Sequence, residues 1–316
     1  MNPNDVIVSI RCTVFNHGPY LRQCLDGFVM QKTNFKFEAF VHDDASTDDS
    51  AAIILEYAQK FPDIIVPFIE TENLYSKRNG QFQSVTYSPS HLRGKYIAMC
   101  EGDDYWTDPM KLQKQVDFLD NHPECSMVFG NAVEHWEDGC HPDQTFADLE
   151  NRYYSGVELS QRWIVPTATI LFRREVLLSD PLHKSLFSPH IMAGDLPLCL
   201  SCAELGSIYC INELLAVYRR VPQGFWRSLD APRRLKMGRD RIEIYRIFGY
   251  RYKKSTIGMA FYHYMRAWQI AKEEKKVKLQ MKAMWKSFIL ACRFPAIAIQ
   301  RLALILREKH AESFER

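Results

Sequence analysis

The sequence predicts an α/β fold in which helices cover a mostly parallel β-sheet. Between residues 6 and 134, short apolar segments typical of buried strands alternate with segments of helical periodicity. Two of the strand-like segments end in clusters of carboxylates, at the position where sheets of this class bind ligands. After residue 228 the periodicity becomes purely helical. We therefore expect two parts, an α/β domain over residues 1–228 and a helical extension over residues 229–316.

The α/β domain begins with a regular alternation of elements. Its opening strand precedes a helix whose apolar residues recur every three or four positions, as one buried face requires. The elements expected in this first half are strand 6–11, helix 20–31, strand 37–42, helix 48–60, strand 64–69, a helix near 82–92, strand 96–100, helix 110–121 and strand 126–134. Residues 140–165 carry no clear periodicity. After them we expect strand 167–172, helix 195–205, strands 207–212 and 214–219, and helices near 232–248, 256–275 and 277–308.

The most informative segment is 96–108, Tyr-Ile-Ala-Met-Cys-Glu-Gly-Asp-Asp-Tyr-Trp-Thr-Asp. Its apolar start predicts a buried strand, and Glu101, Asp103 and Asp104 follow within four residues. Carboxylates packed so closely repel one another unless a cation lies among them, and oxygen ligands suit Mg²⁺ or Mn²⁺. Because Mg²⁺ is commonly held by one or two carboxylates together with substrate phosphates, the segment indicates a metal–diphosphate site. The alternative is a solvated acidic loop in which Asp108 caps the next helix.

A second acidic strand end lies at Asp43 and Asp44, directly after the strand expected at 37–42. Ser46 or Thr47 is a suitable N-cap for the helix that follows, and acidic residues are favourable in its first turn. Capping therefore explains the polar residues after position 45. It does not explain the two carboxylates at the strand end, which we interpret as part of a ligand site.

The total charge of +2 conceals a strong asymmetry. Residues 229–316 contain 21 Lys and Arg against 8 Asp and Glu, whereas residues 1–228 contain 19 against 30. A basic segment of this kind is typical of contact with nucleic acid or an anionic membrane, and because no nucleic-acid-binding motif accompanies it we expect no nucleic acid as a partner. Its apolar runs are shorter than the roughly 20 residues of a spanning helix. Two interpretations stay open: an appendage that packs on the α/β domain or forms a homodimer, and an interfacial helix that inserts Trp285, Phe288, Ile297 and Leu304 into a membrane.

The cysteines favour a reducing compartment. Nine of them are irregularly spaced, and the start of the chain lacks the basic region of a signal peptide. We therefore expect free thiols and a cytoplasmic protein. The CxxC pair Cys199 and Cys202 lies inside an expected helix without a second pair beside it, which favours a buried helix face over a redox or zinc site.

Taken in order, these motifs resemble the family 2 glycosyltransferases of GT-A fold. The resemblance rests on Cys-Thr-Val-Phe-Asn-His at 12–17, Val-His-Asp-Asp-Ala-Ser-Thr-Asp at 41–48 and Glu-Gly-Asp-Asp-Tyr-Trp-Thr-Asp-Pro at 101–109. Met-Gln-Lys-Thr-Asn-Phe-Lys-Phe-Glu at 30–38 and Lys-Leu-Gln-Lys-Gln-Val-Asp-Phe-Leu at 111–119 are similar to one bacterial branch of that family. The resemblance covers about residues 5–227, and it implies a Rossmann-like mixed sheet that binds a nucleotide-diphospho-sugar.

The resemblance also implies roles for individual residues. Glu101, Gly102 and Asp103 match the family's Asp-x-Asp motif, which makes Asp103 a ligand of Mn²⁺ or Mg²⁺ and Glu101 a second ligand or a contact to the ribose. Asp44 would hydrogen-bond a uracil-type base. Asp195, in Met192-Ala-Gly-Asp-Leu-Pro-Leu, matches the catalytic base, a role that is compatible with capping the following helix. The other residues implied at the donor are Thr13, Phe15, Asn16, Arg78, Arg219 and Arg220, the last two in a closing loop at 216–226, and those implied toward the donor sugar and acceptor are Asp104 and Trp106.

The implied reaction is a metal-dependent glycosyl transfer that inverts the anomeric centre. The donor is expected to be a UDP-sugar, and the acceptor a glycan or a lipid-linked glycan in the assembly of a cell-surface polysaccharide or lipopolysaccharide. The expected location is the cytoplasm, with peripheral contact to the inner face of the plasma membrane. Two rival functions are a non-catalytic nucleotide-sugar-binding protein and a sugar-phosphate nucleotidyltransferase. The second would need a basic Gly-rich loop near the first strand, where this chain has Asn16-His-Gly-Pro-Tyr.

Overall fold

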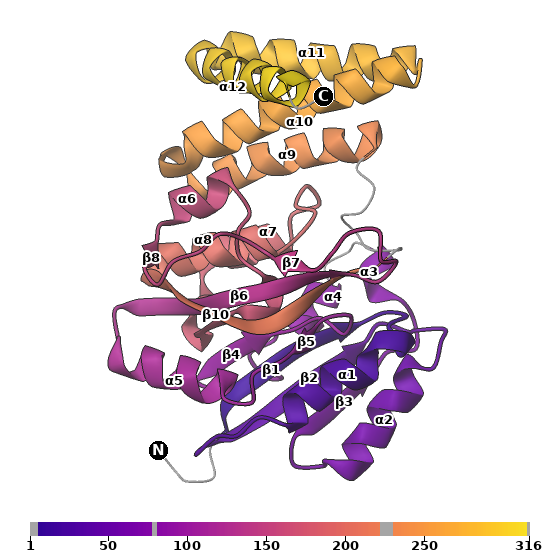
Figure 1. Ribbon diagram of the computed structural model, residues 1–316, viewed down its shortest axis with the longest axis vertical. Helices are drawn as coiled ribbons and strands as arrows, with labels where there is room; N and C mark the ends of the chain where they lie inside the picture. The colour runs from indigo at the N-terminus through magenta and orange to yellow at the C-terminus, as the bar shows by residue number, and fades with distance from the viewer. Residues whose placement is uncertain (1–5, 78–80, 222–229, 315–316) are drawn as a thin grey trace.

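The computed structural model describes residues 6–77, 81–221 and 230–314. In these residues ten strands form one mixed sheet (Figure 1). From one edge to the other, the main strands are β3 (Ile65–Ile69), β2 (Lys36–Asp43), β1 (Val6–Val14), β4 (Tyr96–Met99), β9 (Leu171–Arg173), β6 (Cys125–Trp136), β10 (Ser207–Arg220) and β5 (Tyr105–Trp106). The short β7 (Gln144–Thr145) pairs with β6, and β8 (Tyr153–Tyr154) pairs with β10.

The long strands pair in parallel and the short ones in antiparallel fashion. β1 lies parallel to both β2 and β4, β2 is parallel to β3, and β10 is parallel to β6. The three-residue β9 joins the two parallel groups by antiparallel pairing with β4 and β6. The predicted mostly parallel α/β sheet is therefore confirmed. Because β1 lies between β2 and β4, the two acidic strand ends flank the end of the first strand.

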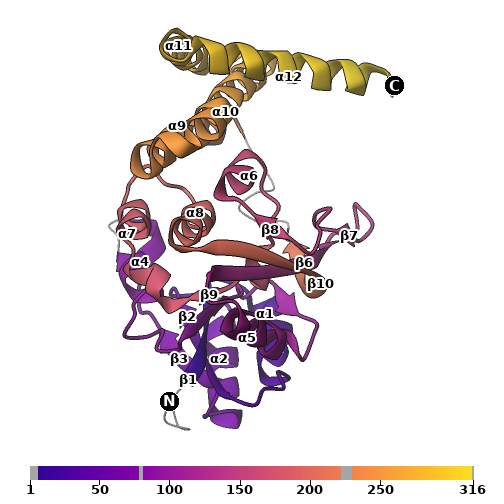
Figure 2. The ribbon, with the colours of Figure 1, turned by 90° about the vertical axis from the view of Figure 1, so that its left-hand side faces the viewer.

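Helices cover both faces of the sheet (Figure 2). One face packs against α1 (Gly18–Val29), α2 (Ser50–Lys60) and α5 (Lys111–Asn121), whose apolar stripes meet inward-facing residues of the strands in one core. The second core lies on the other face, under α6 (Gly156–Gln161), α7 (Asp180–Leu186), α8 (Asp195–Leu205) and the 3₁₀ helix η2 (Arg174–Leu178). The remaining elements of the domain are α3 (Leu74–Lys77), α4 (Gln81–Thr86) and the 3₁₀ helix η1 (Thr167–Thr169).

The C-terminal part is a helical bundle beside the second face. It consists of α9 (Ala231–Phe248), η3 (Tyr250–Tyr252), α10 (Lys253–Glu273), α11 (Val277–Arg293) and α12 (Pro295–Phe314), around a core of their own. The α9–α10 contact is close, because a Cβ added at Gly238 would lie 2.2 Å from the Cε1 atom of Tyr264. A further apolar cluster joins Ile244 and Tyr252 to Leu196 and Leu200 of α8, so the bundle is docked on the α/β domain. The expected boundary at residues 228 and 229 lies outside the described residues.

Several expected elements differ from the structure. The helix predicted at 48–60 begins at Ser50, with Asp49 as N-cap and no side-chain cap, so capping by Ser46 or Thr47 is wrong. The reason is that Ser46 instead bonds Asp43, through its Oγ at 2.5 Å and its N–H at 3.0 Å. The two strands predicted at 207–212 and 214–219 are one strand, β10, with register shifts in its middle. The helix predicted at 277–308 is interrupted at Phe294, before Pro295, which has no N–H to continue the hydrogen-bond ladder.

The segment predicted to be irregular, 140–165, contains two short strands and α6. Its helix begins with a capping box, in which the Ser155 hydroxyl accepts the Glu158 N–H and the Glu158 carboxylate accepts the Ser155 N–H. Cys199 and Cys202 lie buried in α8 as free thiols, as expected. Across the described part of the chain, no helix is both long and apolar enough to pass through a bilayer.

Candidate active site

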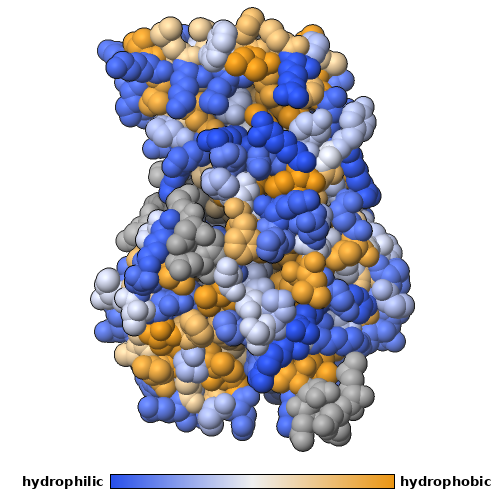
Figure 3. All heavy atoms as spheres, turned by 180° about the vertical axis from the view of Figure 1, so that it is seen from behind, coloured by the Kyte–Doolittle hydropathy of each residue, from blue (hydrophilic) through white to orange (hydrophobic). Residues whose placement is uncertain are grey.

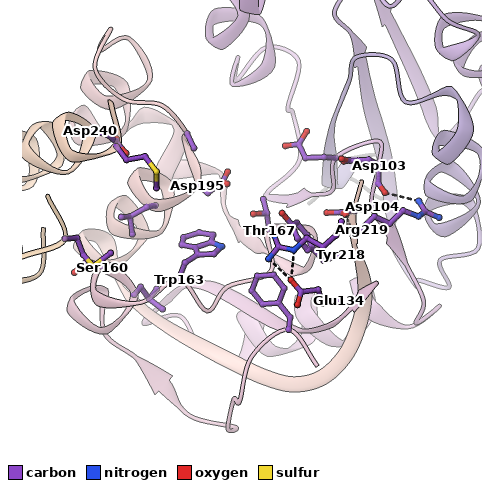
Figure 4. A pocket seen from close by; sticks show the side chains of 18 of the residues that line it. Asp103, Asp104, Glu134, Ser160, Trp163, Thr167, Asp195, Tyr218, Arg219 and Asp240 are labelled. Carbon is purple, nitrogen blue, oxygen red and sulfur yellow. Dashed lines mark hydrogen bonds and ion pairs between the residues drawn. The ribbon is translucent and has the colours of Figure 1, made fainter. Parts of the chain in front are cut away.

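A cavity of about 730 Å³ opens at the carboxyl end of the parallel strands and extends to the C-terminal helices (Figure 4). Its walls come from both acidic and basic segments that are far apart in the sequence. The α/β domain contributes Glu101, Asp103, Asp104, Glu134, Trp136, Phe146, Leu159, Ser160, Gln161, Trp163, Thr167, Ala193, Asp195, Leu196, Tyr218, Arg219, Arg220 and Val221, and the helical part contributes Met237, Asp240, Arg241, Met259 and His263. The structure therefore brings the motif at 101–104, the segment around Asp195 and the end of β10 together in one cavity.

Glu101 is held in place by the first strand. Its Oε1 lies 3.0 Å from Nη1 of Arg11, and its Oε2 accepts a hydrogen bond from the Thr13 hydroxyl. The Arg11 side chain is almost fully buried, donates to the Thr86 carbonyl oxygen at 3.1 Å and stacks over Tyr87. Both carboxylate oxygens of Glu101 thus already have protein partners.

Asp103 and Asp104 differ sharply in their surroundings. The Asp103 carboxylate is about one quarter exposed, and the imidazole of His17 is near it, with Nε2 3.9 Å away. Asp104 is buried and accepts the Arg219 backbone N–H at 2.8 Å. Burial, followed by the nearby Asp103 charge, raises the pKa of Asp104 well above its usual range. The Glu101 side chain is more exposed, at 31%, but both of its oxygens have protein partners, so Asp103 is the carboxylate of the motif that is most available to a ligand.

The two arginines at the end of β10 have different environments. Arg219 is buried, donates from Nη1 to the Asp103 carbonyl oxygen at 2.9 Å and from Nη2 to Gln23, and lies 2.7 Å from Glu137 through Nε. Its guanidinium also stacks on Tyr105, 4.4 Å from the ring centre. Arg220 pairs with Glu134 at 2.5 Å and remains 28% exposed. Arg219 therefore ties the motif loop to α1, and Arg220 is the more accessible of the two.

Asp195 is the first residue of α8 and faces the cavity opposite Asp103 (Figure 4). Burial raises the pKa of its carboxyl group to about 6, and the Glu101 charge acts in the same direction. Arg11 and the Thr167 hydroxyl oppose this shift. A carboxylate with a pKa of about 6 is ionised at neutral pH and is a stronger base than an ordinary aspartate, as general-base chemistry requires.

The residues expected to bind the nucleotide surround the end of β1. Phe15 is 45% exposed and free to contact a ligand. Asn16, at a positive φ of 57°, is fixed to the following loop, because it donates to Ser46 Oγ at 2.8 Å and accepts the Thr47 N–H at 2.8 Å. Asp44 is buried, and its carboxylate accepts the N–H groups of Leu74 and Tyr75 at 2.7 and 3.0 Å. Its direct contact with a base stays a prediction, and its observed partners are backbone groups of α3.

Three further residues were predicted to belong to the site: Gly102, Trp106 and Arg78. Gly102 is buried between β1 and α1, where a Cβ would lie 2.9 Å from His17 Nδ1 and from Val14 Cγ2. Trp106 is not at the cavity wall: it is 2% exposed, donates from Nε1 to the Ala168 carbonyl oxygen at 2.7 Å and packs in the core against Phe28. The expected acceptor-side contact of Trp106 is therefore wrong for this structure. Arg78 lies outside the described residues.

Several cavity residues were not anticipated from the sequence. Ser160 and Trp163 belong to the segment judged irregular, where the Ser155–Glu158 spacing was a readable signal for a helix start. Asp240, Arg241 and His263 belong to the helical part, which was assigned to packing or membrane contact only. Nothing in their local pattern separates them from other polar residues on amphipathic helices.

The motif fits a divalent metal that is bound largely by its substrate. Among the described residues, no three His, Cys, Asp or Glu side chains converge as a complete ligand set. Asp103 and Glu101 both line the cavity and are partly exposed, but Glu101 is engaged by Arg11 and Thr13, which leaves Asp103 as the more available ligand. This donor set is the one expected where one or two carboxylates and substrate phosphates share a Mg²⁺ or Mn²⁺ ion.

The sheet and the site have the GT-A architecture, and comparison with known proteins identifies the family. The profile described as glycosyl transferase family 2 matches residues 9–178, so the chain belongs to this family. It is 38% identical over 228 residues to the protein Rv1520 of Mycobacterium tuberculosis, an alignment that includes 72% of this chain and 62% of that protein. The chain thus spans less than two thirds of the length of that relative.

Two solved structures share the fold at low sequence identity. TarS of S. aureus in complex with UDP-GlcNAc superposes with a TM-score of 0.61 and 13% identity, over 93% of this chain and 82% of TarS. The mannosyltransferase PcManGT of Pyrobaculum calidifontis, in complex with GDP-Man and Mn²⁺, superposes with a TM-score of 0.50 and 15% identity, over 97% of this chain and 89% of that protein. At these identities the likeness establishes the GT-A architecture.

Proposed function

We propose that the protein is an inverting glycosyltransferase that moves a sugar from a nucleoside-diphosphate donor to an acceptor hydroxyl. The observation that carries this proposal is the position of Asp103 and Asp195 on opposite walls of one cavity, the first accessible to a ligand and the second a carboxylate of raised pKa. The family membership and the nucleotide sugars bound by TarS and PcManGT support it. UDP is the nucleotide we expect, as in the TarS complex.

The donor would lie between the end of β1 and the 101–104 motif. Exposed Phe15 would contact the base, while Thr13 and Asn16 would act mainly by fixing Glu101 and the 46–47 loop. Asp103 would hold a divalent cation, Mn²⁺ or Mg²⁺, which when bound supplies positive charge to a departing diphosphate. Glu101 would support the site from its Arg11 pair, as a contact to ribose or to a metal-bound water.

The chemistry at the acceptor would depend on Asp195. Its carboxylate would take the proton of the acceptor hydroxyl while that oxygen forms a bond to the anomeric carbon. The bond between this carbon and the diphosphate oxygen breaks at the same time, so the electron pair leaves with the nucleoside diphosphate. Attack from the face opposite the leaving group inverts the anomeric centre. Arg220, the more accessible of the two arginines, would meet the diphosphate if it exchanged Glu134 for the donor.

The helical part offers a surface suited to an anionic membrane, and we propose that it holds the site near a lipid-linked acceptor. α11 packs inward through Ala283, Ser287 and Leu290. Its other side exposes an apolar stripe formed by Val277, Met281, Met284, Trp285, Phe288 and Ile289, with Lys278 and Lys282 beside it. Figure 3 shows apolar and charged side chains side by side on this end of the molecule. Such an amphipathic surface suits the boundary of an anionic bilayer. Of the residues predicted to insert into the membrane, Ile297 instead packs partly into the bundle.

A donor panel tests the proposed function. UDP-, GDP- and dTDP-sugars are incubated with the purified full chain and Mn²⁺ or Mg²⁺, and nucleoside diphosphate is measured by chromatography. Release from at least one donor supports a transferase, because such enzymes hydrolyse donors slowly when no acceptor is present. Tight donor binding without release from any of them would favour the non-catalytic binder. Assembly of a cell-surface polysaccharide or lipopolysaccharide is the pathway we expect.

A further inference from the structure

The cavity continues past Asp195 to an end formed by α6, α9 and α10 that the proposed transfer chemistry does not use. In Figure 4 Asp240 and Ser160 lie at this end, on the side away from Asp103 and Arg219. Met237, Arg241, Met259 and His263 complete its wall from the helical part. We call this region, defined by Ser160, Asp240, Arg241 and His263, the helical end of the cavity.

Among the described residues, two nitrogen donors at the helical end have no acceptor. Arg241 lines the cavity, and its Nε is buried without a hydrogen-bond partner. His263 is 3% exposed, and its Nδ1 lies 3.2 Å from Nη1 of Arg234. Because a guanidinium can only donate, Nδ1 accepts this hydrogen bond, and the ring proton therefore sits on Nε2. That Nε2 is also buried without a partner.

The charges around this end are mainly positive. Arg234, Arg241 and Arg301 all act on His263, and burial together with these cations lowers the pKa of His263 to about 2, so the imidazole stays neutral. The opposing charge is Asp240, which accepts the Met192 N–H and has its other oxygen, Oδ1, unpartnered. Three guanidinium groups thus act on His263, and of these Arg241 lines the cavity and lies beside the Asp240 charge. The carboxylates of Glu101, Asp103, Asp104 and Asp195 lie on the other walls of the same cavity.

We propose that the helical end binds an anionic group of the acceptor, a phosphate or a carboxylate, between Arg241 and the Nε2–H of His263. A guanidinium and an imidazole N–H supply charge-assisted and neutral hydrogen bonds to an oxyanion, and burial strengthens both. The four carboxylates at the opposite end would repel the same group. The acceptor would therefore enter in one direction, with its anion on α9 and α10 and its hydroxyl toward Asp195. The choice of acceptor as the ligand rests on the proposed function, whereas anion binding itself does not.

Helix α9, which carries Asp240 and Arg241, also contacts the segment that precedes Asp195. Arg239 Nη2 lies 2.8 Å from His190 Nε2, the Ser188 hydroxyl donates to Glu243 at 3.2 Å, and Asp240 accepts from Met192. α9 thus touches residues 188–192, directly before the proposed base. An anion held by Arg241 on this helix would lie beside the segment that sets the position of Asp195.

Nitrogen NMR of the full-length protein, labelled with ¹⁵N in its histidine rings, tests the proposal. The His263 signals are assigned by their loss in His263→Gln, and inorganic phosphate is added against KCl of equal ionic strength. We expect a saturable shift of the His263 Nε2 signal with phosphate only. Arg241→Gln should weaken this binding by about tenfold or more, the effect of losing a charge-assisted hydrogen bond. Arg241→Lys, which keeps the charge, should lose less, and this separates loss of binding from loss of folding.

The matched control is Lys236→Gln, which removes the same charge from an exposed position on α9 and should bind phosphate like the wild type. Methyl phosphate, glucuronate and glucose then separate phosphate, carboxylate and neutral ligands. No His263 shift beyond that of KCl, equal affinity in Arg241→Gln, or an equal shift with glucose would overturn the proposal. These NMR measurements of binding require no turnover. A negative result would therefore overturn the anion site alone, whereas a lack of nucleoside diphosphate release in the donor panel would overturn the proposed function.

Discussion

The guanidinium of Arg11 lies 3.0 Å from the carboxylate of Glu101, and this pair joins the first strand to the acidic motif at the end of β4. The same two groups act on Asp195 with opposite signs, since Glu101 raises the pKa of the Asp195 carboxyl and Arg11 lowers it. Glu101 therefore influences the proposed base across the cavity, besides any contact with the donor.

The first prediction concerns the pH dependence of donor turnover. A base with a pKa of about 6 is protonated at lower pH, so kcat/KM should fall with a midpoint near pH 6 on the acidic side. Glu101→Gln removes a charge that raises this pKa, and the midpoint should move to lower pH. The measurement is nucleoside diphosphate release from pH 4.5 to 8.5 in both proteins. If the acidic-side midpoint of the pH profile is the same in the variant and the wild type, the Glu101 charge does not influence the pKa of the base.

The second prediction concerns the metal. Asp103→Asn deletes the accessible carboxylate of the motif and should remove most donor turnover while the thermal unfolding midpoint stays close to that of the wild type. Excess EDTA should likewise remove most donor turnover of the wild-type protein, and added Mn²⁺ should restore that turnover. Asp117→Asn, an equivalent change on the exposed side of α5, is the control. Full turnover in excess EDTA would exclude the proposed metal.

The third prediction separates the two arginines at the end of β10. Arg219 is buried and holds Asp103, Gln23 and Glu137, so Arg219→Ala should lower the free energy of unfolding by about 2–3 kcal/mol. Arg220 is partly exposed but its partner Glu134 is buried, so Arg220→Ala should cost about 1–2 kcal/mol, less than Arg219→Ala, while weakening donor binding. Urea unfolding of both variants makes the comparison. Equal losses of stability would contradict the structural role assigned to Arg219.

The fourth prediction concerns the apolar stripe of α11. The full chain should co-sediment with anionic vesicles in a salt-sensitive way and bind neutral vesicles weakly. Replacing the exposed Met281, Trp285 and Phe288 by Ser should abolish this binding, because these side chains would enter the bilayer. A surface variant is preferable to truncation, since α9 and α10 form part of the cavity. Leu178→Ser, at an exposed apolar site on η2, is the control. Unchanged sedimentation of the triple variant would end the membrane proposal.

The sequence was sufficient for the parts of the fold that rest on local patterns. The helix predicted at 195–205 matches α8, and the acidic strand ends at Asp43 and Glu101 do flank β1, because periodicity and turn residues are local signals. The burial of the Trp106 side chain could not be predicted from local patterns. An aromatic side chain beside a site motif can point to the cavity or, as here, to the core.

The contribution of the helical part to the cavity could not be predicted from sequence patterns. Arg241 and His263 become cavity residues only because α9 and α10 dock on α8, and this docking depends on long-range contacts such as those of Ile244 and Tyr252. The internal partners of Asp44 and Glu101 are likewise tertiary features. A motif identifies such residues as important, and the structure shows which of their oxygens are already engaged.

The most direct test of the proposed mechanism is Asp195→Asn, measured for donor binding by calorimetry and for transfer to an acceptor hydroxyl. The change is nearly isosteric and removes the proposed base without touching the Asp103 side of the cavity. We predict donor affinity within about threefold of the wild type and transfer lower by roughly 10²–10⁴, the range expected for a lost general base. Undiminished transfer with intact donor binding would contradict the assignment of Asp195 and with it the central claim.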